Sequence, residues 1–488
     1  MLEYKRILDS VHGYIKSPKS YFNIIDSIWF QRLRRIEQTS GRALFPCARH
    51  DRFIHSLGVF HLGCMVVDSV TKKNYRQLVG EKEYDFITKC YLIACLLHDI
   101  AHTPFSHTFE NYYDNAENNL KVTLKDYFQQ SNFAFDWDNQ LNVSAPHEIM
   151  SAIIAITQFE NFFGENNIDI DGKELVARMI IGCQYIKDKY EMSFRNAFIE
   201  LIHGVIDVDG LDYACRDAWA SGYSTSQIDI VRLIDSIHIQ KDNTTKLYQL
   251  CFSFKAINEI ESLLSVKNFQ QYNVINHHTI VYEQELLKQA MQSVACFHYD
   301  MLIHDFEQRK VALQKLCSFE SYQKPISLPK SNILLFMPSD DDFVHLMKYI
   351  PNDKYVSQWL SRKYDLVPLW KSRADFYSIF PILLDKKYHD ECWLFRDDCK
   401  EFIANVANVS REDVWILKAT PVYKGKFADK LYITTNDTIQ KYTDLLPRDK
   451  NSYSPEYIPF RYIYVPKTAN KQLILGALRE EIKKYVFG

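Results

Sequence analysis

The sequence predicts a mainly α-helical protein, with a large helical lobe over residues 1–324 and a smaller α/β lobe over residues 325–488. Apolar side chains recur at helical spacing through most of the first lobe. Short β-type runs bounded by Asp, Asn and Pro follow after about residue 325. A chain of 488 residues also exceeds what one ordinary hydrophobic core supports, so two lobes are expected.

The first lobe is expected to begin with a short strand or hairpin arm over residues 1–20, where two turn signals occur. A helix is expected over residues 26–38, with Asp26 as its N-cap. The remaining helices of this lobe are expected over residues 57–70, 84–98, 148–159, 174–183, 194–206, 228–237 and, as one long helix, 281–315.

Residues 111–146 interrupt the helical pattern with a polar, Asn-rich stretch that carries scattered aromatic side chains. A connection of this length between two segments of candidate site residues predicts a partly structured insertion, flexible or lid-like. In the smaller lobe, four β-type runs precede a C-terminal helix: 332–337, 413–424, 430–435, 460–467 and the helix over 470–486.

The overall charge gives no support for a nucleic-acid-binding surface that covers the whole molecule. The formal net charge is −3, with 47% hydrophobic and 24% charged residues, as in an ordinary globular protein. Local positive charge is dense near the N-terminus, where it fits either a solvated helix face or an anion-binding site. The residues are Arg32, Arg34, Arg35, Arg42, Arg49 and Arg52.

The eleven cysteines include no CxxC pair, which predicts free thiols in a reducing compartment rather than a cysteine zinc site. The N-terminal segment has no apolar core of a secretory signal. No apolar run approaches the roughly 18–20 residues that span a bilayer. We therefore expect a cytoplasmic protein with no membrane association.

A run of histidines and aspartates in a fixed order is the strongest functional signal. His98 and Asp99 end an apolar helical stretch, so an imidazole and a carboxylate are presented together from a rigid helix end. His55 and Asp209 complete a set of four from three separated segments. Such a set binds a divalent metal, whether Mn, Mg, Fe or Ni, and leaves positions open for water and phosphate oxygens. The sequence therefore predicts a metal-dependent phosphohydrolase.

Three further histidines, His102, His107 and His147, follow closely enough to supply acid or base groups beside that metal. Pro104 forces the chain away from the preceding helix, which predicts a turn whose imidazoles face the metal cavity. A histidine there could protonate a departing alkoxide, which contributes on the order of 10²–10⁴ in rate. Glu110 could hold one of these rings in the required tautomer, or it could be a solvated helix carboxylate.

The segment after Ile206 is predicted to place Asp209, Tyr213 and Asp217 on one helix face, at i, i+4 and i+8. Tyr213 could stack on a sugar or base while Asp217 accepts a hydroxyl. Packing of Tyr213 into the core is an equal alternative.

These residues resemble the deoxynucleoside triphosphate (dNTP) triphosphohydrolases of the HD-domain superfamily. The similarity runs in order over roughly the first 240 residues and is faint afterwards. The segments that carry it, after His12-Gly13, are IIDSIWFQRLRRIEQ, RHDRFIHSLGVFHL, HDIAHTPFSHTFE, His147-Glu148 and IDVDGLDYACRD.

The resemblance implies hydrolysis of a dNTP between the α-phosphorus and O5′, which gives deoxynucleoside and triphosphate. It implies that His55, His98, Asp99 and Asp209 hold the metal, and that His107 acts near O5′ with support from Glu110. His102 and His147 would line the same pocket. The implied substrate contacts are Gln38 to the 3′-hydroxyl, Arg52 to phosphate, and Tyr213 with Asp217 to the deoxyribose. Asp26, Gln31 and Arg34 match positions that bind an activating nucleotide between subunits in some relatives, so a dimer or dimer-built assembly is expected.

Four positions depart from the family pattern. Gly210 stands where relatives often carry a phosphate-contacting lysine, so binding of the triphosphate group is in question. Thr39 replaces a leucine that often walls the sugar, and Leu8 replaces an asparagine of the activator site. Glu110 replaces an aspartate, which is a tolerable change.

Two alternatives stay open beside the dNTP triphosphohydrolase. The first is an HD-domain phosphohydrolase or phosphodiesterase that acts on another nucleotide or an oligonucleotide end. The second is a nucleotide-sensing or nucleic-acid-binding protein with little turnover, including weak binding of single-stranded nucleic acid. A complete ligand set argues against the second.

Overall fold

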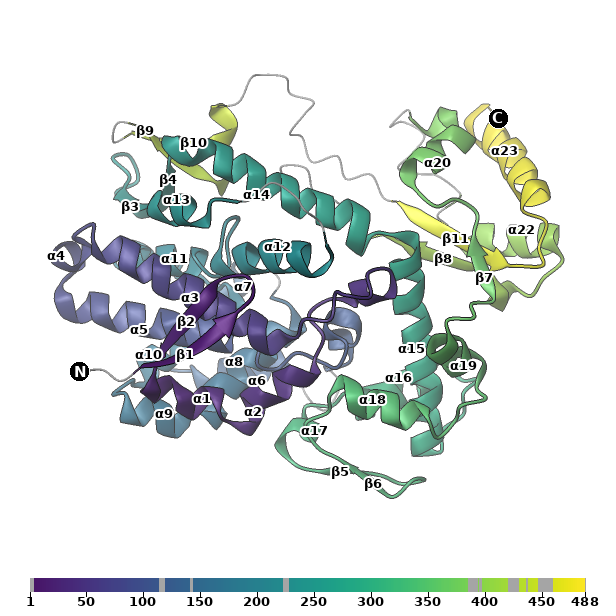
Figure 1. The fold of residues 1–488 in the computed structure, drawn as a ribbon, viewed down its shortest axis with the longest axis horizontal. Coiled ribbons are helices and arrows are strands. Elements are labelled where there is room, and N and C mark those ends of the chain that lie inside the picture. The colour runs from purple at the N-terminus through teal and green to yellow at the C-terminus, as the bar shows by residue number, and fades with distance from the viewer. Residues whose placement is uncertain are drawn as a thin grey trace.

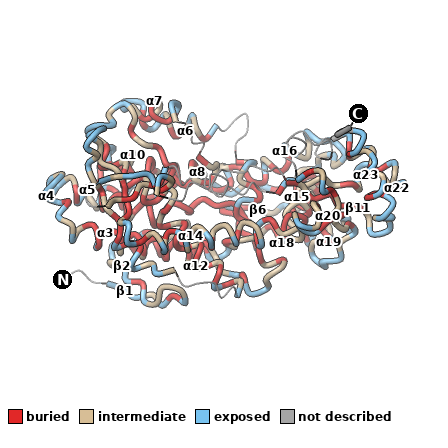
Figure 2. Tube along the Cα trace, turned by 90° about the horizontal axis from the view of Figure 1, so that it is seen from above, coloured by how far each residue is buried: buried red, intermediate tan, exposed pale blue. Residues whose placement is uncertain are grey.

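The computed structural model describes residues 4–113, 119–140, 144–222, 228–384, 394, 397–419, 430–435, 438–445 and 460–487. The chain is mainly helical, with small sheets, as the sequence predicts. Figure 1 shows a helical lobe and a smaller α/β lobe, with helix α15 (His278–Tyr299) between them. Buried residues run through both lobes in Figure 2. The division after residue 324 stays a prediction.

The N-terminal arm is the expected hairpin. Strands β1 (Tyr4–Asp9) and β2 (Gly13–Pro18) pair antiparallel, with Asp9 opposite Gly13. Gly13 has a φ of 73°, which suits glycine in the tight turn. Asp9 is buried and accepts hydrogen bonds from both terminal nitrogens of Arg216, at 2.8 and 3.1 Å, which fixes the arm to the helical lobe.

The helix expected over residues 26–38 is shorter than predicted. Helix α1 (Phe22–Ile25) ends at Asp26, and α2 (Ile28–Arg32) begins after Ser27, whose hydroxyl accepts from the amide of Phe30. Ser27, not Asp26, is therefore the N-cap, because Ser27 alone of the two has the extended backbone that a cap needs. A 3-10 turn (Leu33–Arg35) follows before the chain becomes extended.

Five helices form the centre of the helical lobe. Asp51 caps α3 through the amide of Ile54, which starts this helix five residues before the expected Leu57. The helix that presents His98 ends at Leu97, one residue before the predicted end. The five are α3 (Arg52–Thr71), α5 (Glu81–Leu97), α8 (Pro146–Gln158), α10 (Ile170–Ile181) and α12 (Val208–Ala220).

Helix α3 corrects one sequence expectation. By length and composition it could cross a membrane, because an 18-residue window has a mean hydropathy of 1.5. However, 67% of that window is buried, and the helix carries the buried side chains of Arg52 and His55. Its apolar character is that of a core helix.

The described part of the insertion is packed rather than lid-like. Helices α6 (Leu120–Tyr127) and α7 (Phe133–Asp138) lie on the helical lobe. Asp136 is fully buried and pairs with Arg178 of α10 at 2.9 Å, while its other oxygen accepts from two backbone amides. Removing one partner of such a pair costs about 3–5 kcal/mol, so these residues are firmly anchored.

The end of the helical lobe differs most from the prediction. The helix expected over 228–237 ends at Asp235 (α13, Ile230–Asp235) and is followed by strands β3 (Ile237–Lys241) and β4 (Tyr248–Ser253). Strand β9 (Tyr432–Thr435) pairs in parallel with β4, in a sheet of order β10-β9-β4-β3. The run 430–435 therefore lies beside the helical lobe, with β10 (Thr438–Lys441) at the sheet edge.

The helix expected over 281–315 is two helices. Helix α15 ends where Asp300 adopts a left-handed conformation, with φ of 54°, and Asp305 caps α16 (Phe306–Leu316). The apolar pattern alone predicts one continuous helix, but Asp300 ends the first helix and Asp305 begins the second. The remaining α-helices up to residue 361 are α4 (Tyr75–Val79), α9 (Glu160–Glu165), α11 (Ser193–Glu200), α14 (Ile257–Gln270), α17 (Glu320–Gln323), α18 (Asp340–Met347) and α19 (Lys354–Ser361).

The smaller lobe is built on an antiparallel sheet of order β7-β11-β8. Two of its strands and the C-terminal helix fall in expected segments, and 333–335 forms a separate hairpin with 326–328. Residues 420–424 of one expected run lie outside the described residues. The elements are β5 (Ile326–Leu328), β6 (Ile333–Leu335), β7 (Leu366–Pro368), β8 (Trp415–Lys418), β11 (Arg461–Pro466), α20 (Arg373–Ile379), α22 (Asp397–Ala407) and α23 (Lys471–Phe487).

Candidate active site

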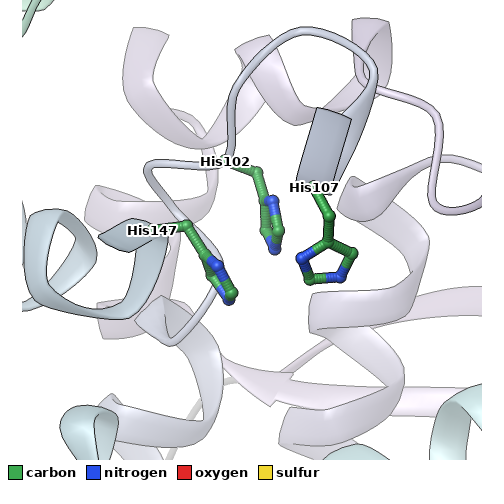
Figure 3. A group of neighbouring side chains, drawn as sticks. All are labelled: His102, His107 and His147. Carbon is green, nitrogen blue, oxygen red and sulfur yellow. The ribbon is translucent and has the colours of Figure 1, made fainter. Parts of the chain in front are cut away.

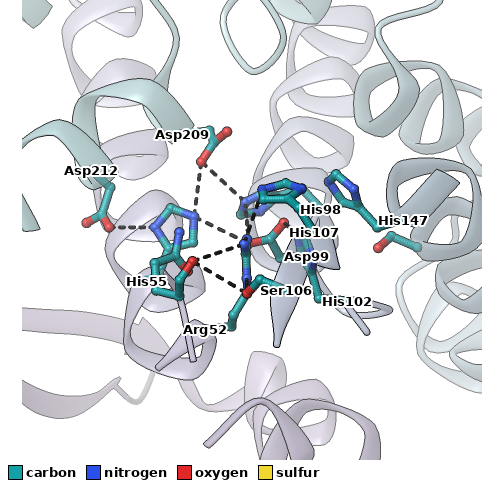
Figure 4. A network of polar contacts seen from close by, with 12 residues as sticks. Arg52, His55, His98, Asp99, His102, Ser106, His107, His147, Asp209 and Asp212 are labelled. Atoms are coloured by element: carbon teal, nitrogen blue, oxygen red, sulfur yellow. Dashed lines mark hydrogen bonds and ion pairs between the residues drawn. The ribbon is translucent and has the colours of Figure 1, made fainter. Parts of the chain in front are cut away.

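Three helices bring the four predicted metal ligands to one point (Figure 4). His55 lies near the start of α3, His98 and Asp99 directly follow α5, and Asp209 lies in the first turn of α12. The Nε2 atom of His55 is 3.0 Å from Asp209 Oδ1 and 3.4 Å from Asp99 Oδ2. The Nε2 atom of His98 is 3.5 Å from Asp99 Oδ2. Ligand atoms of His55, His98 and Asp209 all lie within 4.8 Å of one another.

The orientation of the His55 and His98 imidazoles is fixed by contacts of their Nδ1 atoms. The Nδ1 atom of His55 lies 2.7 Å from Asp212 Oδ2, and that of His98 lies 3.0 Å from the carbonyl of Cys95. Both Nε2 atoms therefore face the carboxylates, and neither makes a hydrogen bond of normal geometry within the described part of the chain. Buried imidazole nitrogens without hydrogen bonds, next to two carboxylates, fit a divalent metal.

The charges of the site are strongly coupled. Burial alone would raise the pKa of Asp99, but Arg52, His98 and His102 hold that pKa well below its usual range. Burial would lower the pKa of His55, but the adjacent carboxylates of Asp209 and Asp212 raise it to about 10. Without a metal, His55 is therefore an imidazolium at neutral pH.

Metal binding is expected to displace a proton, because His55 must become neutral to act as a ligand. The apparent metal affinity should rise about tenfold for each pH unit between roughly 6.5 and 8.5, since His55 titrates only near pH 10. Calorimetric titration of Mn²⁺ into metal-free protein, in two buffers of different ionisation enthalpy, measures the proton count. Binding without proton release would contradict the coupling.

In the metal-free protein, the ion pairs of His55 with Asp209 and Asp212 contribute to the free energy of unfolding. This contribution is complete below about pH 6.5 and is lost as the pH rises through about 10.

A second histidine cluster, His102, His107 and His147 (Figure 3), lies beside the predicted metal ligands (Figure 4). The rings of His102 and His147 stack with centroids 3.9 Å apart, and His107 meets His102 edge-on at 4.9 Å. Glu110 Oε2 is 2.5 Å from Nδ1 of His147 and 3.3 Å from Nδ1 of His107. Burial would raise the pKa of Glu110, but these two histidines lower it below its usual range, so Glu110 is a carboxylate that orients both rings.

His102 and His107 differ in exposure and charge. His102 is fully buried, with Nε2 3.1 Å from Asp99 Oδ1. Burial, together with Arg52 and His147, holds the pKa of His102 well below its usual range, so its ring is neutral. The side chain of His107 is 62% exposed, which leaves it open to a bound ligand.

The turn that carries His107 is held by a distant carboxylate. Phe105 and Ser106 have φ angles of 57° and 55°, a conformation that costs non-glycine residues about 1–3 kcal/mol each. Asp340, at the start of α18, accepts the amide of Phe105 at 2.6 Å and the amide of Glu37 at 2.9 Å. Asp340 therefore clamps the turn to the segment that precedes Gln38.

Two of the predicted substrate-binding residues, Arg52 and Gln38, lie next to the four predicted metal ligands. Arg52 is buried and donates to Asp99 at 2.6 Å and to Ser106 at 2.9 Å, so its charge is already paired. Gln38 is buried, and its Oε1 atom has no hydrogen-bond partner among the described residues. The other side of the site contains Tyr213, which is half-buried, and Asp217, which lies 2.7 Å from His50 Nε2.

The three positions predicted to bind an activator lie on the surface near the N-terminal hairpin. Gln31 accepts from Arg34 at 2.9 Å, while Asp26 is 3.5 Å from Lys5. Arg34 also stacks over Phe53. A role in nucleotide activation stays a prediction.

The sequence did not predict the residues that contact the metal ligand His55 and fix its orientation. Asp212 binds His55, His12 and Arg216, and Arg216 binds Asp9. A local signal existed, because Asp212 and Arg216 are four residues apart on the helix that carries Asp209. Gly58 shows how close this packing is: a Cβ there would lie 1.9 Å from Asp212 Oδ1.

Residues 52–179 match the HD-domain family model, over the segment that contributes His55, His98 and Asp99. The matched segment is about a quarter of the chain. The candidate site extends beyond it to Asp209, so the matched segment and α12 together form the site.

Other proteins similar to this chain include phosphohydrolases. The deoxynucleoside triphosphate triphosphohydrolase SAMHD1 homolog of Dictyostelium discoideum is 29% identical over 264 residues, which is 54% of this chain and 44% of that protein. The chain thus spans less than half the length of this relative. An uncharacterized protein of Methanocaldococcus jannaschii is 26% identical over 490 residues, covering 98% of this chain and 83% of that protein. A phosphohydrolase structure from Bacteroides thetaiotaomicron has the same fold, with a TM-score of 0.62 at 19% identity, covering 95% of this chain and all of that one.

Proposed function

We propose that this protein is a metal-dependent dNTP triphosphohydrolase that converts a dNTP and water to deoxynucleoside and inorganic triphosphate. One observation carries the phosphohydrolase chemistry: the Nε2 atoms of His55 and His98 converge with two carboxylates next to a second, acid–base histidine cluster. The dNTP as substrate is supported by the similarity to the Dictyostelium dNTP triphosphohydrolase.

Each side chain then has a physical task. A divalent metal held by His55, His98, Asp99 and Asp209 would polarise a phosphate oxygen and activate water. Arg52, fixed by Asp99 and Ser106, presents a rigid positive charge beside the α-phosphate. His107 donates a proton to the departing O5′, and Glu110 holds its ring through Nδ1.

We assign recognition of the deoxyribose to Gln38, Tyr213 and Asp217. The unpartnered Oε1 atom of Gln38 accepts a hydrogen bond from the 3′-hydroxyl. Tyr213 packs against the deoxyribose, and Asp217, oriented by His50, accepts a hydroxyl or water near the sugar. A ribose 2′-hydroxyl would have to fit against the same wall, so comparing dATP with ATP tests this assignment.

The direct test is to incubate purified protein with each of the four dNTPs, singly and as mixtures, with Mn²⁺ or Mg²⁺, and to separate the products by chromatography. Deoxynucleoside with inorganic triphosphate in equal amounts is the expected result. Nucleoside monophosphate with pyrophosphate, or turnover of a phosphodiester only, would instead favour another HD-domain phosphohydrolase activity. The mixtures also supply any nucleotide that activates the protein by binding at Asp26, Gln31 and Arg34.

Replacing Asp340 with alanine is expected to lower kcat about 10- to 100-fold while bound metal stays unchanged. The clamp on Phe105 and Glu37 is lost, the buried amide of Phe105 loses its acceptor at a cost of about 1–3 kcal/mol, the half-buried amide of Glu37 also loses its acceptor, and the strained turn relaxes. Steady-state kinetics, metal analysis and thermal unfolding measure the three effects. Asp341→Ala is the matched control, because Asp341 is exposed on the same helix turn and pairs only with Arg35 among the described ion pairs. Equal kcat in both variants would contradict the clamp.

A further inference from the structure

The turn of the N-terminal hairpin is connected to the metal site through one buried aspartate. The hairpin β1–β2 lies against α3, the helix that carries His55 (Figure 1). In its turn, the side chain of His12 is only 5% exposed, and its Nε2 atom lies 2.6 Å from Oδ1 of Asp212. The other oxygen of Asp212 lies 2.7 Å from Nδ1 of His55 (Figure 4). A single carboxylate therefore contacts both the hairpin and a predicted metal ligand.

The Asp212 carboxylate is fixed on all sides. An ionised carboxylate only accepts hydrogen bonds, so both His12 and His55 donate to it. Arg216 donates to the same carboxylate through Nε at 2.8 Å and Nη2 at 2.9 Å. Helix α3 also packs so closely that a Cβ atom at Gly58 would lie 1.9 Å from Asp212 Oδ1. A carboxylate held in this way keeps the proton of His55 on Nδ1 and leaves Nε2 for the metal.

The hairpin holds this carboxylate by two routes. His12 contacts it directly, and Asp9 accepts from both terminal nitrogens of Arg216, at 2.8 and 3.1 Å, which fixes the arginine that binds Asp212. The amide of His12 donates to Asp9 at 2.9 Å, so one turn positions both residues. Gly13, with its φ of 73°, lets the chain reverse directly after His12. The pair His12-Gly13, at which the resemblance to the HD-domain enzymes begins, thus has a physical task near the metal.

We propose that His12 is a positioning residue for the metal, and that docking of the N-terminal hairpin raises the metal affinity of the site. His12 does not act on the substrate: it fixes Asp212, which keeps His55 in the tautomer and orientation of a ligand. Since coupling between two equilibria is reciprocal, the hairpin must also dock more firmly when the metal is bound. The inference rests on the proposed function only for the position of the metal.

The first test measures the Mn²⁺ affinity of the full-length protein by calorimetry. His12→Leu keeps an apolar side chain of similar bulk but removes the donor, and it should weaken Mn²⁺ binding about 10- to 100-fold. His12→Gln keeps an N–H donor and should recover most of this loss. Tyr14→Ala is the control and should bind Mn²⁺ like the wild type, because Tyr14 lies on the same hairpin but is 62% exposed.

The outcomes separate this proposal from the proposed function. Equal Mn²⁺ affinity of the wild type and a folded His12→Leu protein would overturn the role of His12 and leave the metal ligands as assigned. Equal losses in His12→Leu and His12→Gln would also overturn it, because the packing of the turn and not the hydrogen bond would then decide the affinity. No Mn²⁺ binding by the wild type would overturn both proposals. Intact Mn²⁺ binding without dNTP turnover would overturn only the choice of substrate.

The second test needs no substitution that could prevent folding. Backbone hydrogen exchange of residues 4–18 in the wild type should slow about fivefold or more when Mn²⁺ is added, because the metal favours the docked hairpin. The hairpin β5–β6 is the matched control: its residues make none of the contacts to Asp212 described above, so its exchange should not change. Exchange of residues 4–18 that is the same with and without bound Mn²⁺ would contradict the coupling.

Discussion

Replacing His98 with alanine is expected to remove the bound metal and to lower turnover by roughly a thousandfold or more. His98 Nε2 is one of the two imidazole nitrogens directed at the metal position, and its orientation is fixed by the carbonyl of Cys95. The metal supplies several kcal/mol of transition-state stabilisation, and each 1.36 kcal/mol corresponds to about tenfold in rate. Loss of metal and loss of turnover should therefore occur together.

The measurement is metal content after Mn²⁺ loading and dialysis, alongside steady-state turnover of the best substrate. His304→Ala is the control, because His304 is exposed in the loop between α15 and α16. His98 is a better choice than Asp99, since removing Asp99 would leave Arg52 buried without its partner and could unfold the protein. A His98→Ala protein that keeps stoichiometric metal and full turnover would disprove the assignment.

The metal set could be predicted from sequence because its key pair is local. His98 and Asp99 are adjacent and follow an apolar helix whose end the pattern marks, so their joint presentation follows from helix geometry. Their supports could not be predicted, because they are long-range. Asp212 reaches His55 across 157 positions, and Asp340 reaches Phe105 across 235.

The same distinction explains the errors in the fold. Helices with a strong apolar stripe were found, but their ends depend on caps such as Ser27, Asp51 and Asp300, which compete with the pattern over one or two residues. The parallel pairing of β9 with β4 joins segments about 180 residues apart, and no local signal records it.

Replacing His107 with alanine is expected to reduce kcat by about 10²–10⁴ while bound metal and stability are retained. The loss follows from removing the group that protonates the departing O5′. Stability should change by less than about 0.5 kcal/mol, because 62% of the side chain is exposed and Glu110 keeps its 2.5 Å contact with His147. His102→Ala would not separate an effect on catalysis from an effect on stability, because that ring is fully buried against Asp99.

A substrate with a better leaving group separates the chemical role of His107 from a binding role. If His107 protonates O5′, the defect of His107→Ala should shrink for a nucleotide analogue whose leaving group has a low pKa, because that group needs no proton. Glu110→Gln should give a smaller defect of the same kind, since the carboxylate only orients the rings of His107 and His147. A defect that appears in KM and is equal for both leaving groups would mean that His107 binds the substrate rather than protonating it.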